Sequence, residues 1–242
     1  MHLLIDVGNS RIKWRLIIDE YNDDDLTQYG LLADLATYIG GLETHKISVL
    51  LAAVNQTEQL KRLLSKYEFK AVIVADSQPN QAGIVNSYQQ PERMGIDRWL
   101  AMIAAFSART KQQGIIVVDA GSALTIDVVS ACGVHLGGYI VPGLLMAQRA
   151  LFSSTERVIQ YEEGISSEER YEKLHKLGNN TVQCVEYGVI NQLIALVRQV
   201  QEEYVGYEIF FTGGDGQLLA TSIQAGTVDE NLVLKGLWQV RN

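Results

Sequence analysis

Two stretches of the sequence share one pattern, in which an apolar run ends on an aspartate and the chain then turns through a glycine. The first is LLIDVGNS at residues 3–10, and the second is IIVVDAGSAL at residues 115–124. Their aspartates, Asp6 and Asp119, lie 113 positions apart, close to half of the 242 residues. A period of that length is too long for a solenoid but suits two similar α/β halves. We therefore expect two lobes, residues 1–113 and 114–242, with both loops at the mouth of one cleft.

Further apolar runs alternate with helical patterns along the chain. Runs rich in Val and Ile at 47–54, 71–75, 124–129 and 208–212 are typical of strands, several of them buried on both faces. Helical spacing is clearest in the segments that begin at Asp97 and Thr181. This alternation predicts an α/β fold, with room for an antiparallel meander in the first third.

Composition and charge exclude several classes of protein. The chain is 47% hydrophobic and 20% charged, as in ordinary folded enzymes. Its net charge of −8 argues against a nucleic-acid-binding surface, which needs clustered Lys and Arg. No apolar run approaches the roughly 20 residues of a membrane helix. Cys132 and Cys184 lack the spacing of zinc ligands and fit a reducing compartment, so we expect a cytoplasmic protein with no membrane or nucleic-acid partner.

The first loop has two interpretations. Gly8 permits a sharp turn in which backbone N–H groups point at a ligand, Asn9 and Ser10 add donors, and Lys13 adds a point charge suited to phosphate. Asp6 cannot bind phosphate directly but suits a magnesium ion held through water. The alternative is a plain hairpin turn. This motif alone leaves both open.

The second loop repeats these elements. Asp119, Gly121, Ser122 and Thr125 supply a carboxylate, a turn and two hydroxyls. A strand-turn-strand unit of a core sheet is the alternative, but a carboxylate after the run GIIVV is costly to bury without a cation or several donors. The glycines at 213–216 would let the flat ring of a ligand lie against the backbone at a helix start. A tight strand-to-helix connection explains these glycines better. The glycines and proline at 137–143 are interpreted as structural.

A third candidate site lies in GIDRW at residues 95–99. Asp97 and Arg98 come at the start of a helix, after the permissive Gly95. An aspartate there is a common cap. It is equally suited to act as a general base beside a cation that binds a carboxylate. The four histidines stand singly and are interpreted as incidental, and the chain has neither a G-x-S-x-G nor a P-loop pattern.

Taken together and in this order, DVGNSRIK, GIDRW, DAGSALTID, GGYIVPG, NNT and FTGGDG resemble the type III pantothenate kinases. The resemblance implies a duplicated actin-like ATPase fold of the ribonuclease H-like kind, with a nucleotide cleft between two similar lobes. It implies ATP-dependent phosphorylation of pantothenate to 4'-phosphopantothenate, the first step of coenzyme A biosynthesis. Magnesium and a monovalent cation, potassium or ammonium, are the implied cofactors.

The resemblance also implies a role for each matching residue. Asp97 would be the proton acceptor, Asp119 would hold the monovalent cation, and the TGGDG loop would lie on the adenosine side. Thr181 would reach pantothenate from the second subunit of a homodimer. The implied ATP-binding residues are Asp6, Val7, Gly8, Asn9, Ser10, Arg11, Ile12, Lys13 and Ser122. The implied pantothenate-binding residues are Tyr88, Gly95, Ile96, Asp97, Arg98 and Thr181.

Two other functions remain open at this point. A sugar or acetate kinase of the same superfamily would keep the phosphate loops but would have no reason to carry GIDRW after an aligned tyrosine. A nucleotide-binding accessory or regulatory factor would bind ATP without substrate-dependent turnover. The joint presence of Asp97, Arg98, Asp119 and Thr181 favours the pantothenate kinase.

Overall fold

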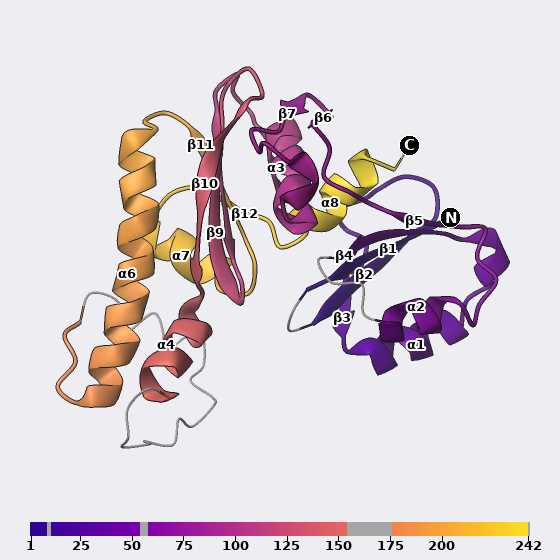
Figure 1. Ribbon diagram of the computed structural model, residues 1–242, viewed down its shortest axis with the longest axis horizontal. Coiled ribbons are helices and arrows are strands. Elements are labelled where there is room, and N and C mark those ends of the chain that lie inside the picture. The colour runs from indigo at the N-terminus through magenta and orange to yellow at the C-terminus, as the bar shows by residue number, and fades with distance from the viewer. Residues whose placement is uncertain (9–10, 54–57, 154–175, 242) are drawn as a thin grey trace. The chain divides into compact units, whose positions relative to one another are not determined.

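The chain divides into two compact units (Figure 1). The computed structural model describes residues 1–8, 11–53, 58–153 and 176–241. The first unit comprises Met1–Ala108, Gly133–His135 and Asn231–Asn242, and the second comprises Arg109–Cys132 and Leu136–Glu230. Each unit therefore contains segments that are far apart in the sequence.

A five-stranded mixed sheet forms the centre of the first unit. The strands, in order across the sheet, are β3 (Gln28–Gly30), β2 (Ile12–Ile17), β1 (His2–Val7), β4 (Ser48–Ala53) and β5 (Ala71–Val74). β1 runs antiparallel to β2 and parallel to β4, β2 runs antiparallel to β3, and β4 runs parallel to β5. The expected antiparallel meander of the first third is confirmed as β1, β2 and β3.

Helices cover both faces of this sheet. The helices α1 (Leu32–Gly40) and α2 (Glu58–Leu64) lie together on one face (Figure 1), and α8 (Leu232–Gln239) packs on β1, β4 and α3 (Ile96–Ala108). Short elements complete the unit: η1 (Thr44–Lys46), β6 (Asn80–Gln81), β7 (Ile84–Val85) and η2 (Pro91–Arg93). The core under α1 and α2 includes Leu3, Ile5, Ile12, Trp14, Leu35, Ile39, Leu60 and Leu63.

The second unit repeats the strand order of the first. Its sheet contains, in order, β10 (His135–Pro142, of which His135 belongs to the first unit), β9 (Ala123–Val129), β8 (Ile115–Ala120), β11 (Glu208–Thr212) and β12 (Thr227–Val228). β8 is antiparallel to β9 and parallel to β11, as β1 is to β2 and β4. The expected duplication of an α/β half is therefore confirmed.

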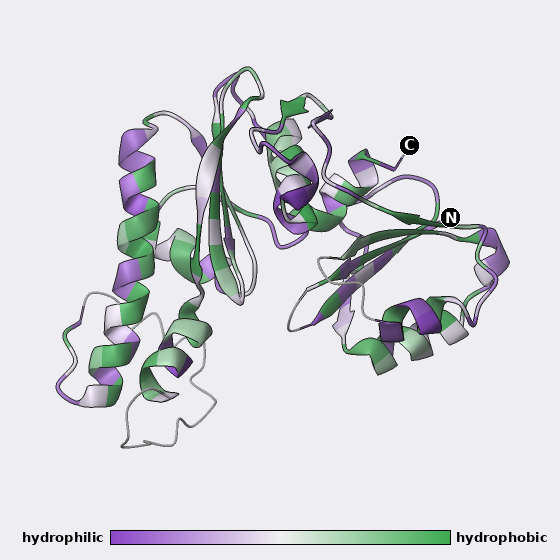
Figure 2. Ribbon diagram, viewed as in Figure 1, coloured by the Kyte–Doolittle hydropathy of each residue, from purple (hydrophilic) through white to green (hydrophobic). Residues whose placement is uncertain are grey.

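Among the described residues, the helices that accompany the second sheet are α4 (Leu144–Ser153), α6 (Thr181–Glu203) and α7 (Gly216–Ile223). Apolar residues of α6 recur every three or four positions, and Val189, Ile190, Leu193, Ile194 and Val197 form the face that enters the core. Towards the C-terminal end of α6 the exposed residues are polar, among them Arg198, Gln199 and Glu202, and Figure 2 shows hydrophilic patches along this part of the helix. Among the described residues, no helix is both long enough and apolar enough to cross a membrane.

Glu208 at the start of β11 fastens the beginning of the second unit. Its carboxylate accepts hydrogen bonds from the backbone N–H and hydroxyl of Thr110 and from the backbone N–H of Lys111, at 2.7 to 3.0 Å. Desolvation raises the pKa of Glu208, but these hydrogen bonds and the charge of Lys111 outweigh it, so the pKa lies below its usual value. This contact therefore stabilises the fold at neutral pH and loses its effect as the pH falls through the lowered pKa.

Two helical glycines give a matched test of this packing. A Cβ at Gly236 of α8 would clash with the carbonyl oxygen of Leu100 in α3, whereas a Cβ at Gly188 of α6 has nothing within 4 Å. We expect Gly236→Ala to lower the free energy of unfolding by about 2 kcal/mol, because overpacking forces the helices apart. We expect Gly188→Ala to raise it by about 0.5–1 kcal/mol, because alanine restricts the unfolded backbone. Equal denaturation midpoints for the two variants would contradict the close crossing of α3 and α8.

Candidate active site

The first predicted phosphate loop joins β1 to β2 in the first unit. Asp6 and Lys13 are directly opposite each other in the antiparallel register, so their side chains lie on the same face of the sheet. Asp6 is half-buried, whereas Leu3, Leu4 and Ile5 before it are fully buried. The strand therefore presents its carboxylate where the apolar core ends. Val7 and Ile12 form the last pair before the loop, Gly8 lies exposed on it, and Asn9 and Ser10 lie outside the described residues.

The two cations that follow this loop lie beside an aromatic ring. Lys13 is paired in register with Tyr29 of β3, and its Nζ lies 5.8 Å from the centre of the Tyr29 ring. The Arg11 guanidinium lies 4.8 Å from the same ring centre. Arg11 is exposed and Lys13 half-buried. The charges at positions 11 and 13 are therefore compatible with a strand, because this end of the face is open to solvent.

The second predicted loop joins β8 to β9 in the second unit, and Asp119 occupies the position in β8 that Asp6 occupies in β1. Its register neighbours are Thr125 in β9 and Thr212 in β11. The three side chains share one face of the sheet, so a half-buried carboxylate is flanked by two hydroxyl-bearing residues. The first loop has a lysine and Ala52 in the equivalent positions.

Two further glycine-containing segments, at residues 213–216 and at Gly143, contact the second loop. A Cβ at Gly213, whose φ is +84°, would lie 2.5 Å from both Asp119 Oδ1 and the carbonyl oxygen of Ala120. The N–H of Asp215 donates to that same carbonyl at 2.9 Å. On the other side, the N–H of Gly143 donates to the carbonyl of Ser122 at 3.0 Å. The structure therefore brings the 213–216 glycines and Gly143 to the loop that carries Ser122.

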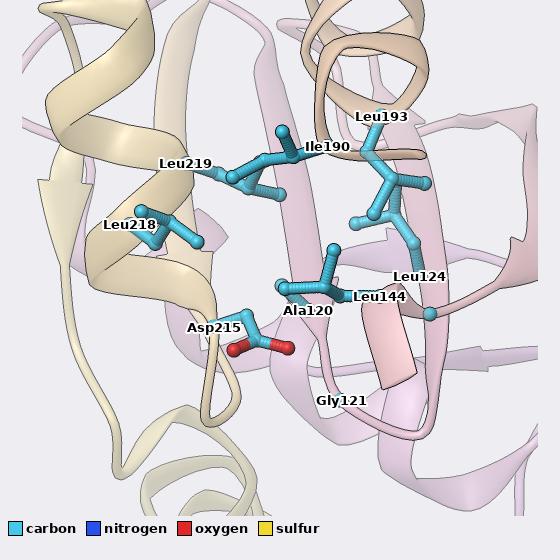
Figure 3. Close-up of a pocket in the computed structure, with 10 residues that line it drawn as sticks. Ala120, Gly121, Leu124, Leu144, Ile190, Leu193, Asp215, Leu218 and Leu219 are labelled. Carbon is cyan, nitrogen blue, oxygen red and sulfur yellow. The ribbon is translucent and has the colours of Figure 1, made fainter. Parts of the chain in front are cut away.

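The helices α4 and α7 begin at these two contacts, at Leu144 and Gly216. Helix N-termini carry unpaired N–H groups and a partial positive charge, which favours a phosphate group nearby. Behind the loop is a pocket whose walls are apolar; Leu144, Ile190 and Leu218 line it, and Asp215 lies at the end nearest Gly121 (Figure 3). Apolar residues that line the pocket come from α4, α6 and α7, beside the loop.

The GIDRW segment forms the start of α3, as predicted. Oδ1 of Asp97 accepts a hydrogen bond from the backbone N–H of Arg98 at 2.8 Å, which fixes the orientation of the carboxylate. A Cβ at Gly95 would lie 2.6 Å from that oxygen, so a side chain at this position would displace the Asp97 carboxylate. Ile96, the first residue of α3, is buried in the core. Asp97 is half-buried, whereas Arg98 is only 6% exposed.

Tyr88 joins this group from the preceding loop. Its hydroxyl accepts a hydrogen bond from Nη1 of Arg98 at 2.8 Å. Its backbone N–H donates to Oδ1 of Asn86 at 3.0 Å, which fixes the loop locally. The sequence-predicted residues Tyr88, Asp97 and Arg98 are therefore brought together in the first unit. Sequence reasoning did not find His135, whose ring packs against Tyr88; a lone histidine gave no signal of this contact.

Thr181 is in the second unit, as the first residue of α6. The preceding Asn180 caps the helix, because its side-chain oxygen accepts the N–H of Gln183 at 3.0 Å. Thr181 itself is exposed. Its hydroxyl is therefore carried on a well-fixed helix terminus that solvent reaches.

Comparison with known proteins shows the family of this chain. The family model described as "Type III pantothenate kinase" matches residues 2–203. A type III pantothenate kinase of Marinobacter nauticus is 36% identical, covering 99% of this chain and 98% of that protein. One of Pseudoalteromonas translucida is 33% identical, covering 98% of this chain and 94% of that protein. These matches extend over nearly the whole chain.

Solved structures show the same fold. A Baf family protein of Campylobacter jejuni, for which a role as transcriptional activator has been suggested, is 25% identical with a TM-score of 0.62, covering 97% of this chain and 94% of that one. A protein of Sinorhizobium meliloti, provisionally assigned as a 2-dehydro-3-deoxygalactonokinase, is 11% identical with a TM-score of 0.51, covering 98% and 97%. The second likeness concerns the fold alone.

The adjacent residues Gly213 and Gly214 test how tightly the second loop is held. We expect Gly213→Ala to lower the free energy of unfolding by about 1–3 kcal/mol, because a side chain is strained at positive φ and meets Asp119. A Cβ at Gly214 has nothing within 4 Å, so Gly214→Ala should stay within about 0.5 kcal/mol of the parent protein. Denaturant unfolding measures both, and a Gly213→Ala variant as stable as Gly214→Ala would contradict this geometry.

Proposed function

The chain belongs to the type III pantothenate kinase family, and from that premise we propose how its residues divide the work of phosphoryl transfer. Its activity is that of an ATP-dependent pantothenate kinase, an enzyme of coenzyme A biosynthesis. Catalysis of this kind consists mostly of positioning and charge stabilisation. The observation that carries the proposal is the group formed by Asp97, Arg98 and Tyr88 at the start of α3.

Asp97 is the proposed general base. The primary hydroxyl oxygen of pantothenate forms a bond to the γ-phosphorus of ATP, the bond from that phosphorus to the β–γ bridging oxygen breaks, and the hydroxyl proton passes to the Asp97 carboxylate. The products are 4'-phosphopantothenate and ADP. The fixed orientation of Asp97 and its partial exposure support this role, because a base must reach the proton it removes.

Arg98 is the proposed group that binds the carboxylate of pantothenate. A guanidinium presents planar, paired N–H donors that match a carboxylate, and this one is oriented by the Tyr88 hydroxyl. Tyr88 and the backbone of Gly95 and Ile96 would complete the contact with the substrate. Asp97 and Arg98 are adjacent, so the general base and the residue that anchors the substrate carboxylate, Arg98, are held in one rigid helical turn.

The two loops are proposed to bind ATP, the first through Asp6–Lys13 and the second through Ser122. Lys13 supplies positive charge, and the helix N-termini at Leu144 and Gly216 add partial charge beside Ser122. Magnesium, when bound, would neutralise phosphate charge, and Asp6 is the residue proposed to hold it through water. No group of three or more His, Cys, Asp or Glu side chains suited to a metal occurs among the described residues. Magnesium in kinase sites is commonly held by one or two carboxylates together with phosphate oxygens and water.

Asp119 is the proposed ligand of a monovalent cation, potassium or ammonium. Its carboxylate shares a sheet face with Thr125 and Thr212, so oxygen donors are the groups at hand. The absent side chain of Gly213 also leaves Asp119 Oδ1 close to backbone. Such a cation would add positive charge close to the second loop.

Thr181 is proposed to contact pantothenate in the other subunit of a homodimer. Its exposure at the start of α6 supports a contact with a second copy of the chain. Thr181→Val would then raise the KM for pantothenate, while a sedimentation measurement of the dimer stays unchanged.

The general-base role is tested by Asp97→Asn, which keeps the shape of the side chain and removes the base. We expect kcat for pantothenate-dependent ADP release to fall by about 10²-fold or more, in line with the usual contribution of a general base. Asp24→Asn, in an exposed turn of the same unit, is the control and should turn over normally. Turnover of Asp97→Asn within a few-fold of the parent enzyme would rule out the base assignment.

The same assay of ADP release distinguishes a pantothenate kinase from the two other functions, a sugar or acetate kinase and an accessory factor. Turnover of a sugar or acetate in place of pantothenate would indicate another kinase of the superfamily. ATP binding without turnover in any salt would indicate an accessory factor. The mass of the phosphorylated product identifies the acceptor directly.

The cation role is tested by comparing turnover in sodium buffer with turnover in potassium or ammonium buffer. We expect the parent enzyme to be stimulated by potassium or ammonium, and Asp119→Asn to lose that stimulation because the carboxylate charge is gone. The Asp24→Asn control should keep the response of the parent enzyme. An Asp119→Asn variant with an unchanged salt response would place the cation elsewhere.

A further inference from the structure

His135 is a buried neighbour of the loop that carries Tyr88. It is 1% exposed, and its Nδ1 lies 2.9 Å from the hydroxyl of Ser87. Its ring lies 6.1 Å, centre to centre, from the Tyr88 ring at an angle of 35°. All three residues belong to the first unit. The imidazole thus contacts two consecutive residues of this loop.

The Tyr88 ring lies near both this histidine and the guanidinium of Arg98. Nη1 of Arg98 donates to the Tyr88 hydroxyl at 2.8 Å, and the guanidinium carbon is 5.8 Å from the centre of the ring. A swing of the Tyr88 side chain about its Cα–Cβ bond would move the hydroxyl that contacts Arg98. A neighbour that limits this swing is therefore part of the positioning of Arg98.

The backbone before His135 is itself firmly held. The N–H of Val85 donates to the carbonyl of Gly133 at 2.8 Å, and Val85 and Val134 form a parallel bridge. Gly133 has a φ of +83°, and a Cβ there would clash with the carbonyl of Gly83. A segment about fifty residues away in the sequence is thus fixed against the β6–β7 hairpin, and His135 is fixed with it.

We propose that His135 is a positioning residue for substrate recognition. It holds the Tyr88 ring in place, and the Tyr88 hydroxyl in turn holds the Arg98 guanidinium in the geometry that selects the carboxylate of pantothenate. This inference rests on the proposed role of Arg98. It predicts that a change at His135 weakens the binding of pantothenate at its carboxylate end. The reacting hydroxyl of pantothenate and the ATP site should be unaffected.

The test compares pantothenate with pantothenol, which carries a primary alcohol in place of the carboxylate. We expect His135→Leu to raise the KM for pantothenate about 10-fold, because a misplaced anchor weakens binding. The KM for ATP should stay within two-fold, and turnover of pantothenol should change little. The preference for pantothenate over pantothenol should therefore fall. His45→Leu, at an exposed histidine, is the matched control and should keep the preference of the parent enzyme.

A double-mutant cycle tests whether His135 acts through Tyr88. Tyr88→Phe removes the hydroxyl that contacts Arg98, so adding His135→Leu to it should cost little more than either change alone. Fully additive losses would overturn the proposed route through Tyr88. Ser87→Ala, which removes only the hydrogen bond to Nδ1, should give a smaller change in the same direction and serves if His135→Leu does not fold.

The outcomes are distinguishable from failure of the proposed function. If the parent enzyme does not phosphorylate pantothenate, the proposed function fails first. If it does, and a folded His135→Leu keeps its preference for pantothenate, this inference is wrong. Equal losses on pantothenate and pantothenol would show a purely structural role and would also overturn it.

Discussion

The end of the central strand is the feature on which each half of this protein depends. In β1 and β8 the residues directly before the aspartate are buried, and the aspartate itself is only partly buried. A carboxylate further back in either strand would lie in an apolar core without a partner, at a large cost in free energy. The sheet therefore determines both that a carboxylate is tolerated and where it is presented. The loops after Asp6 and Asp119 follow from that placement.

Duplication kept this carboxylate and changed its neighbours. Lys13 lies opposite Asp6, whereas Thr125 lies opposite Asp119; on the parallel side, Ala52 corresponds to Thr212. A carboxylate beside an ammonium group and a carboxylate beside two hydroxyls suit different ligands. Two halves with one topology can in this way take different parts in the same reaction. This supports the different roles proposed for the two loops, magnesium with phosphate at one and a monovalent cation at the other.

The substrate-side group depends on contacts between segments instead of on a strand end. Asp97 is oriented by the next backbone N–H, but Arg98 is oriented by Tyr88 from the preceding loop. Tyr88 in turn packs against His135, which enters the first unit on a short excursion of the chain. Base and anchor are thus held by two different kinds of constraint, one local and one tertiary. A change at the tertiary contact is for this reason expected to disturb binding more than proton transfer.

Much of the molecule could be predicted from its sequence, because the relevant signals are local. The apolar runs, the helices beginning at Ile96 and Thr181, and each copy of the Asp-x-Gly pattern are continuous stretches of sequence, and the duplicated α/β fold follows from them. The motifs in their order were enough to suggest the family. Only the tertiary structure placed α8 in the first unit, Gly143 against Ser122 and His135 against Tyr88. These contacts join residues 21 to more than 100 positions apart, and the periodicity of a sequence reports which face a residue occupies but not which distant segment covers it.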